Sequence, residues 1–317
     1  MTAKLPVDAA QAIRSYLRIA DRILPGGIIA CGVTGSIALG AYRPGRSDID
    51  LVAVIAEDWR TRPDLIRRLR LLHLSQVPRL TVGAVRGRGV SACCNTVFIA
   101  ESEVSRPVTE IRPIASHTGE IFDAHGAFDV NPVIWKELVD GGVSVQGRTI
   151  DAWEVDAQPD QLRPWIRTNL REYWIPLATQ LHERPPQDPK AVLRRLLTSP
   201  RGLTASTVEW CVLGPARMHH TLSTGKIIGK DEAGRHVLNA FPQHAPHHRG
   251  GLGQGARRAD PLRTVTCTVA GIDRLGDGGH DHRITRLTDD RSGLSGRREL
   301  DDGCGGLGVS RSALISR

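Results

Sequence analysis

The stretch "TGSIALGAYRPGRSDIDLVAVI" (residues 34–55) places two acids at the start of a segment that otherwise has the composition of a buried strand. Asp48 and Asp50 lie two residues apart, so on a strand both carboxylates point to the same face, about 6 to 7 Å apart along the chain. Two neighbouring carboxylates removed from water are costly unless a cation lies between them. The pattern therefore predicts a shared metal site at the start of this strand.

Upstream of the two acids, Gly35 and Ser36 fall where a predicted strand turns into a short helix. Glycine lets the backbone approach a phosphate closely, serine donates a hydroxyl, and the start of a helix favours negative charge. Mg²⁺ prefers oxygen ligands, and Mg²⁺ ions held by carboxylates bridge the phosphates of a nucleotide and the attacking oxygen. Gly35 and Ser36 are thus predicted to bind phosphate beside a Mg²⁺ site at Asp48 and Asp50.

Hydrophobic periodicity predicts an α+β chain: a mixed sheet flanked by helices, then a helix bundle and an irregular tail. The expected domains are residues 1–150, 151–242 and 243–317. In the first domain, helices are expected at 8–24, 36–42, 62–76 and in the first part of 131–147, and strands at 26–33, 48–55, 80–85, 93–100 and in the last part of 131–147. In the second domain, helices are expected at 159–181, 189–199, 205–225 and 229–241.

The formal net charge of +8 raises the question of nucleic-acid binding. Residues 243–317 contain 12 Arg, no Lys and 9 acids, which leaves 30 basic and 25 acidic residues in the rest of the chain. No basic run with interleaved aromatic residues occurs there, so we interpret the charge as solvated surface charge and do not expect a nucleic-acid partner.

We find neither the pattern of a targeting signal nor a C-x-x-C motif in the sequence. No stretch approaches the roughly 18 apolar residues of a membrane span, and the N-terminal segment lacks the apolar centre of a signal peptide. The six cysteines are scattered without a C-x-x-C pair, which favours reduced thiols over disulfides or a zinc site. We therefore expect a cytoplasmic protein that does not bind a membrane.

The final 75 residues differ in composition from everything before them. They contain 14 Gly and 12 Arg, no Phe, Trp, Tyr or Met, and no helical period long enough to bury a face. We predict that residues 243–317 contribute neither packed structure nor chemistry. Two origins fit this composition: a natural basic tail, and translation of the gene's end in a shifted reading frame.

The Gly-Ser turn, the spacer and the Asp-x-Asp pair resemble the nucleotidyltransferase superfamily, to which DNA polymerase beta belongs. The order of strand, turn, helix and strand around "LGAYRPGRSDIDLVAV" (residues 39–54) is part of this resemblance. It implies that the first domain is a nucleotidyltransferase domain that uses ATP and Mg²⁺.

The helical half resembles aminoglycoside adenylyltransferases of the streptomycin/spectinomycin type. The resemblance is carried by "ARMHHTLSTGKIIGKDEAGRHVL" (residues 216–238) and "FDVNPVIWKELVDGGVSVQG" (residues 128–147). In that family an Arg nine residues before the Lys of a Thr-Gly-Lys-Ile turn helps to hold the nucleotide's phosphates; here these positions are Arg217 and Lys226. Lys226 has a plainer interpretation, as a cation completing a helix that ends at Gly225.

This resemblance implies a Mg²⁺-dependent transferase that moves AMP from ATP to a hydroxyl of a small acceptor. The expected acceptor is an aminoglycoside antibiotic, which would make the protein an antibiotic-resistance enzyme, and the chain is expected to act as a monomer. Two alternatives remain: a catalytically inactive nucleotide-binding protein of the same fold, and a nucleotidyltransferase that modifies RNA or protein.

The sequence departs from the family at two positions. The family supplies a third carboxylate from a following strand as the general base, and here Cys94 or Asn95 stands in its place. Glu101, at the end of that strand, is the first carboxylate afterwards and is our candidate for the base. Pro215 lies inside the helix that carries Arg217, where it is expected to kink the helix and displace the Arg.

Overall fold

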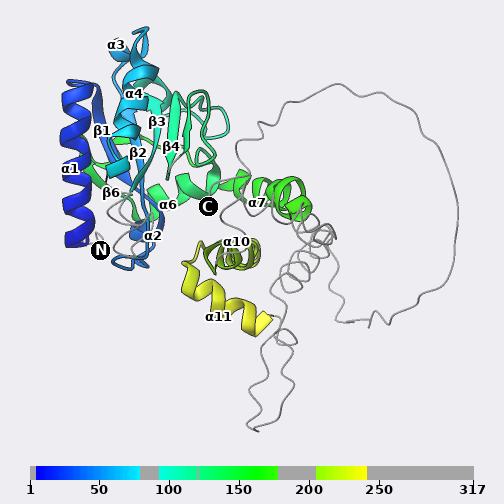
Figure 1. Cartoon of the computed structure of the whole chain (residues 1–317). Helices are drawn as coiled ribbons and strands as arrows, with labels where there is room; N and C mark the ends of the chain where they lie inside the picture. Colours follow the sequence, from blue (N-terminus) through cyan, green and yellow to red (C-terminus); the bar gives the residue numbers. More distant parts are fainter. Residues whose placement is uncertain (1–4, 79–92, 120, 178–204, 241–317) are drawn as a thin grey trace, which may run out of the picture.

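A six-stranded sheet forms the centre of the computed structural model (Figure 1). The structure describes residues 5–78, 93–119, 121–177 and 205–240. The strand order is β5-β4-β3-β2-β1-β6, with the bounds Ile28–Val33 (β1), Ile49–Ile55 (β2), Cys94–Ala100 (β3), Ala115–Thr118 (β4), Ile121–Asp123 (β5) and Val143–Gln146 (β6). β2 and β3 pair in parallel, and the other neighbouring strands run antiparallel. The predicted fold class, a mixed sheet flanked by helices, is confirmed.

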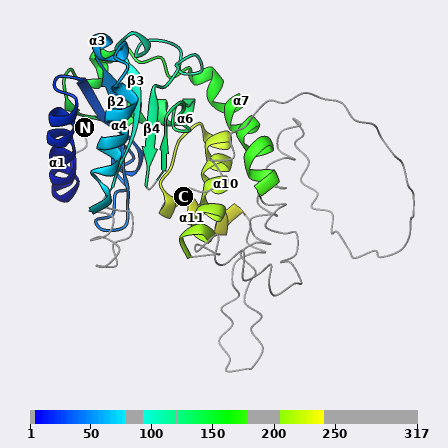
Figure 2. The ribbon, with the colours of Figure 1, turned by 45° about the horizontal axis from the view of Figure 1, so that its top comes forward.

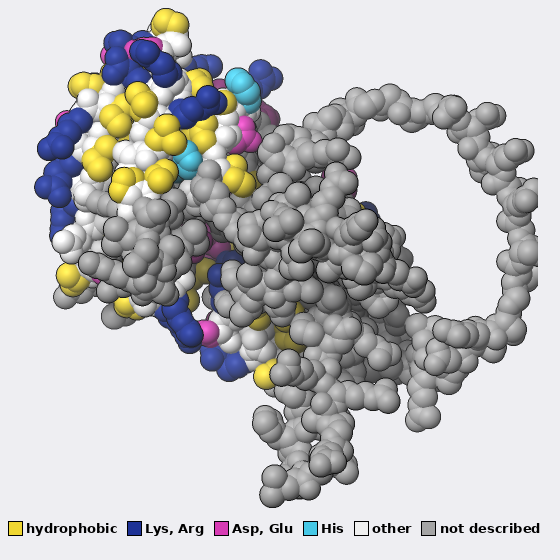
Figure 3. Space-filling view, viewed as in Figure 1, with side chains coloured by type: hydrophobic (Ala, Val, Ile, Leu, Met, Phe, Trp, Pro, Cys, Tyr) yellow, Lys and Arg dark blue, Asp and Glu magenta, His cyan; other side chains and the backbone are white. Residues whose placement is uncertain are grey.

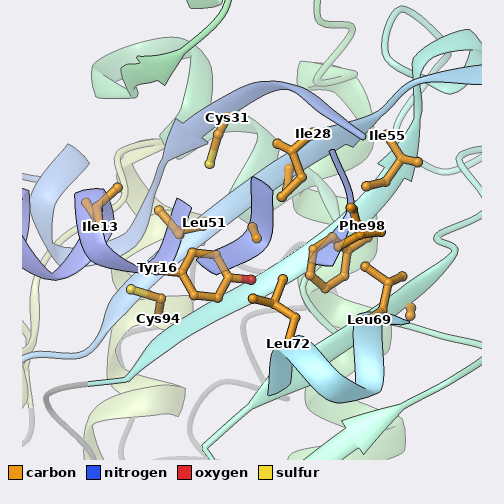
Figure 4. Packing of buried hydrophobic residues seen from close by; sticks show 14 of the residues in the cluster. Ile13, Tyr16, Ile28, Cys31, Leu51, Ile55, Leu69, Leu72, Cys94 and Phe98 are labelled. Atoms are coloured by element: carbon orange, nitrogen blue, oxygen red, sulfur yellow. The ribbon is translucent and has the colours of Figure 1, made fainter. Parts of the chain in front are cut away.

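Helices α1 (Val7–Ile23) and α4 (Leu65–Leu74) cover one face of the sheet. Four residues of α1 are buried at helical spacing: Ala9, Ile13, Tyr16 and Ala20. Ile13 and Tyr16 pack with Leu69 and Leu72 of α4 over the strands, as Figure 4 shows. This amphipathic pattern explains why both helices were predictable from the sequence.

The opposite face of the sheet is covered by α6 (Pro132–Gly141) and the 3₁₀ turn η3 (Ile150–Trp153). Asn131 caps the N-terminus of α6: its side-chain oxygen accepts hydrogen bonds from the N–H groups of Val133 and Ile134, at 3.0 and 3.1 Å. Because successive strand residues point to opposite faces, Val52 and Val54 of β2 pack on this side and their neighbours pack under α1. The same alternation places Asp50 on the α6 side.

Three short elements complete this part: α2 (Gly35–Ala38), α3 (Glu57–Arg60) and the 3₁₀ turn η2 (Glu101–Glu103). The strands β4 and β5 were not predicted, since they contain only four and three residues and three of the four residues of β4 are polar. Their strand conformation depends on pairing, of β4 with β3 and of β5 with β4, rather than on local sequence.

The second part of the chain is helical in every element that the structure describes between residues 159 and 240. These elements are α7 (Pro159–Asn169), the π-helical turn η4 (Leu170–Trp174), α10 (Ala205–Thr224) and α11 (Lys230–Ala240). Figure 2 shows α10 beside α7, with α11 next to α10. α10 continues through Pro215 as one helix. The domain boundary at residue 150 stays a prediction.

Three sequence-based predictions lie outside the described residues: the strand at 80–85, the helix at 189–199 and the tail at 243–317.

Basic side chains gather along the outer edge of α1, at the left of Figure 3. Arg14, Arg18 and Arg22 lie four residues apart on the exposed face of this helix.

None of the helices in the described part of the chain is both long enough and apolar enough to span a membrane.

The end of α6 packs so closely on α2 that Gly141 has no room for a side chain. A Cβ there would overlap the backbone carbonyl oxygen of Ala38. We expect Gly141→Ala to lower the free energy of unfolding by about 1–3 kcal/mol, since backbone atoms must move to relieve the clash. Urea denaturation measures this change.

Gly234→Ala is the matched control, because a Cβ at Gly234 in α11 meets only Leu213 Cδ2, at 3.9 Å. This variant should be stabilised by about 0.5–1 kcal/mol, since alanine favours a helix interior over glycine. Equal stability of Gly141→Ala and the parent would contradict the close contact between α2 and α6.

Candidate active site

The two acids predicted to form a metal site converge on one side chain. The Asn95 Nδ2 amide donates to Asp48 Oδ2 at 3.3 Å and to Asp50 Oδ1 at 3.2 Å. Asn95 pairs with Asp50 in the parallel register of β2 and β3, and its Oδ1 accepts the Gly119 N–H at 3.0 Å, which turns the amide NH₂ toward the acids. The carboxylates of Asp48 and Asp50 therefore lie on the same side of the sheet and contact the same amide group, as the i, i+2 spacing predicted.

The turn at Gly35 lies directly against the second acid. Gly35 has a φ of +62°, and a Cβ there would overlap Oδ2 of Asp50. The Thr34 N–H donates to the Asp50 carbonyl at 2.9 Å, so the end of β1 is tied to the start of β2. Only glycine fits at position 35, both for the backbone conformation and for the close approach.

Ser36 contributes a buried hydroxyl to the same turn. Its Oγ is removed from solvent and has no hydrogen-bond partner among the described residues. A buried polar atom in this state is uncommon in folded proteins and is typical of a site that a ligand or an ion completes. The hydroxyl is thus available to the phosphate that the sequence pattern predicts.

Glu137 is a functional candidate that sequence reasoning missed. This α6 carboxylate is 1% exposed, and its Oε2 accepts the Gly35 N–H at 3.1 Å. Its Oε1 accepts from Arg217 Nη2 at 3.0 Å. One signal was present: Glu137 falls on the apolar stripe of its helix, next to the buried Leu138, where a carboxylate is rarely found without a partner.

Arg217 is held from two sides. Besides Glu137, its Nε donates to the Ile228 carbonyl at 2.8 Å, in the segment that joins α10 to α11. Arg217, predicted to bind phosphate, is thus linked to the Gly35 turn through the Glu137 carboxylate, which accepts hydrogen bonds from both.

Lys226 lies in the same connecting segment, directly after Gly225, whose φ is +74°. The Lys226 side chain is exposed, whereas its backbone is anchored: its N–H donates to Thr224 Oγ1 and its carbonyl accepts from Thr221 Oγ1, each at 3.1 Å. The structure holds the base of this side chain in place and leaves the ammonium group exposed.

Two further contacts join this segment to the loop before Asp48. A Cβ at Gly229 would lie 2.6 Å from Ala41 Cβ, and Arg43 forms an ion pair with Asp231 of α11. The loop that leads into the acidic pair therefore packs against the turn that carries Lys226.

His219 of α10 and His236 of α11 form a pair that does not add positive charge to this region at neutral pH, because burial lowers the pKa of both rings. His219 Nδ1 and His236 Nε2 are 2.7 Å apart, a distance that requires a shared hydrogen bond. Burial, followed by the neighbouring His236 and His220, lowers the pKa of His219 to about 4. Arg217 and Lys226 thus remain the candidate phosphate-binding cations.

Glu101 must be removed from the candidate site. It begins η2 after the last residue of β3, whereas Asn95 lies at the start of that strand beside Asp50. Six residues of strand separate Glu101 from the acidic pair by about 20 Å, because a strand rises about 3.3 Å per residue. A general base must lie within hydrogen-bond reach of the reacting proton, so this candidate was wrong.

The structure also decides between Cys94 and Asn95 as the residue in the place of the expected third carboxylate. Cys94 is buried under α1, on the face of the sheet opposite Asp50. Asn95 is the residue beside the acids.

The donor set fits Mg²⁺ bound together with phosphate. The part of the chain that the structure describes contains no group of three or more His, Cys, Asp or Glu residues that could hold a metal alone. Mg²⁺ is commonly held by one or two carboxylates plus substrate phosphates. Asp48 and Asp50 can supply the carboxylates, beside the Ser36 hydroxyl. The residues therefore suit a metal that arrives with a nucleotide.

Comparison with solved structures identifies a similar fold. The chain is similar to spectinomycin adenyltransferase AAD(9) from Enterococcus faecialis, whose crystal structure was determined with ATP and spectinomycin. The TM-score is 0.52 at 16% sequence identity, and the match covers 83% of this chain and 97% of the other. No family model and no curated protein matches the sequence. The chain therefore shares the fold of this adenyltransferase.

Asn95→Asp tests whether the acidic pair is a metal site. Asp can keep the bond from the Gly119 N–H but replaces the NH₂ group between two carboxylates with a third negative oxygen. Without metal we expect a loss of about 1.5–3 kcal/mol of stability, the contribution of hydrogen bonds to charged groups. Thermal melts in EDTA measure this loss.

With Mg²⁺ the order reverses, since an added carboxylate attracts the ion. We expect half-maximal stabilisation of Asn95→Asp at a Mg²⁺ concentration about tenfold lower than for the parent, a shift of roughly 1.4 kcal/mol. A variant that responds to Mg²⁺ no more than the parent would rule out a metal site at this position.

Proposed function

We propose that this protein is a Mg²⁺-dependent nucleotidyltransferase that moves AMP from ATP to a hydroxyl of a small acceptor. One observation carries the proposal: two carboxylates that converge on Asn95 lie against a glycine turn, and that turn is joined to Arg217 through Glu137. The fold similarity to an adenyltransferase solved with ATP and spectinomycin supports it.

In this proposal each side chain binds or orients one part of the nucleotide. Asp48 and Asp50 would hold the Mg²⁺, which when bound would offset phosphate charge and polarise the reacting phosphoryl group. The Ser36 hydroxyl would donate to a phosphate oxygen. Arg217 and Lys226 would bring positive charge to the phosphates from the helical part.

The reaction would be an in-line attack of the acceptor oxygen on the α-phosphorus. A new O–P bond forms, the bond from the α-phosphorus to the oxygen of the β-phosphate breaks, the acceptor hydroxyl loses its proton to solvent, and pyrophosphate leaves. Catalysis would depend mainly on positioning and on charge neutralisation, because phosphoryl transfer asks little covalent chemistry of the protein. We infer an aminoglycoside-like acceptor by analogy with the structural neighbour, and a monomer that acts in the cytoplasm where ATP is supplied.

A second candidate function is nucleotide binding without transfer. Asn95 favours it, because an amide cannot take up the acceptor's proton near neutral pH. ATP binding without acceptor-dependent pyrophosphate release would identify this protein as a binding module. A pyrophosphate-release screen with Mg²⁺ and ATP over aminoglycosides, with RNA and the other nucleotides as controls, separates the candidates.

Asp50→Asn tests the proposed role of the acidic pair. The change keeps the size of the side chain, so the fold should persist while one charged metal ligand is lost. We expect acceptor-dependent pyrophosphate release to fall by at least about 10³-fold, since loss of a charge-stabilising group at a transferring phosphate costs several kcal/mol.

Asp140→Asn is the matched control. Asp140 is an exposed acid of α6 whose Oδ2 lies 2.8 Å from Lys136 Nζ, and it contacts none of the proposed site residues in the described structure. The activity of the Asp140→Asn variant should equal that of the parent. Turnover retained by the Asp50→Asn variant would contradict the proposed mechanism.

A further inference from the structure

Glu137 is a buried carboxylate that joins two parts of the chain at the candidate site. Its side chain is 1% exposed, and its two oxygens accept from different elements: Oε2 from the Gly35 N–H of α2 and Oε1 from Arg217 Nη2 of α10. Removing a carboxylate from water is expensive unless charged or hydrogen-bonding partners replace the water. The position of Glu137 therefore requires both partners to stay close.

The Arg217 guanidinium is anchored by two of its N–H groups in the described part of the chain. Of the five N–H groups that a guanidinium carries, one is directed at Glu137 and one at the Ile228 carbonyl. The side chain is 31% exposed, so the group reaches the surface of the site. Its other N–H groups can address an anion while the anchored side stays fixed.

Glu137 also determines which atoms of the turn remain for a ligand. The Gly35 N–H is used by Glu137, whereas the buried Ser36 Oγ has no partner among the described residues. A phosphate at this turn would therefore bind at Ser36 rather than at the Gly35 N–H. The carboxylate holds the turn from the side that faces α6.

We propose that Glu137 is a positioning residue that sets the spacing between the Ser36 turn and Arg217, so that both bind the β- and γ-phosphates of one nucleotide. The inference rests on the proposed function, because it assigns Arg217 and Ser36 to the phosphate chain. Glu137 itself does not touch the nucleotide. Its negative charge is balanced by Arg217, so it orients the cation without repelling the phosphates.

Glu137→Gln tests this role. A glutamine offers one oxygen where two donors face the side chain, and its NH₂ group is then directed at either Gly35 or Arg217. We expect the affinity for Mg²⁺·ATP, measured by titration calorimetry, to fall at least tenfold. Affinity for AMP, which lacks the β- and γ-phosphates, should stay within twofold of the parent.

Glu103→Gln is the matched control, because Glu103 has the same kind of environment away from the site. Its side chain is 8% exposed, Oε1 accepts from Arg106 Nη1 at 3.1 Å, and Oε2 accepts the Arg112 N–H at 3.0 Å. Both variants should lower the melting temperature to a similar extent. Only Glu137→Gln should separate ATP from AMP binding.

A double-mutant cycle assigns the effect to Arg217. On an Arg217→Lys background, which has already lost the two-sided anchoring, Glu137→Gln should cost less than a further twofold in ATP affinity. If Glu137→Gln does not fold, Glu137→Asp replaces it: the shorter side chain keeps the charge but cannot reach both partners, and it should weaken ATP binding while sparing AMP.

The outcomes separate two failures. A parent protein that binds no ATP would overturn the proposed function and this role with it. A parent that binds ATP, together with a Glu137→Gln variant that binds ATP equally well or loses ATP and AMP in parallel, would overturn only the positioning role.

Discussion

The need to balance one buried and two partly buried carboxylates organises this molecule around one turn. Asp48 and Asp50 both accept hydrogen bonds from the Asn95 amide. Glu137 accepts hydrogen bonds from the Gly35 N–H and from Arg217. Two of these acids meet at Gly35, whose missing side chain admits Asp50 on one side and whose N–H donates to Glu137 on the other. Because an unpaired buried charge is far more costly than a lost surface contact, these partners restrain each other.

This arrangement gives the helical part a defined place beside the sheet. The segment from Gly225 to Asp231 contacts the first part of the chain at Ala41 and Arg43, and Arg217 reaches Glu137 from the helix just before it. The loop that precedes the acidic pair and the turn that carries Lys226 therefore lie together. A nucleotide bound between them would contact both parts of the chain at once, as the proposed function requires.

Asn95 is the residue that distinguishes this site chemically. Where the resembling family has a carboxylate, this chain has an amide that donates to both aspartates. The amide lowers the repulsion between them in the absence of a metal, but it cannot act as a base. Activity would then depend on positioning and charge neutralisation alone, and a protein without activity would still keep the same nucleotide site.

The sequence by itself determined the local elements and the acidic pair. Helical periodicity located α1, α4 and α6, and the i, i+2 spacing placed Asp48 and Asp50 on one face, because both follow from short-range geometry. The same reasoning misassigned Glu101, since distance along a strand does not reveal which end of the sheet holds the site. β4 and β5 were missed because their strand conformation depends on pairing, of β4 with β3 and of β5 with β4. Only the tertiary structure decided that Asn95 rather than Cys94 faces the acids, and that Glu137 joins Gly35 to Arg217. The reason is that strand register and the contact of Arg217 with Glu137 bring together residues that the sequence keeps far apart.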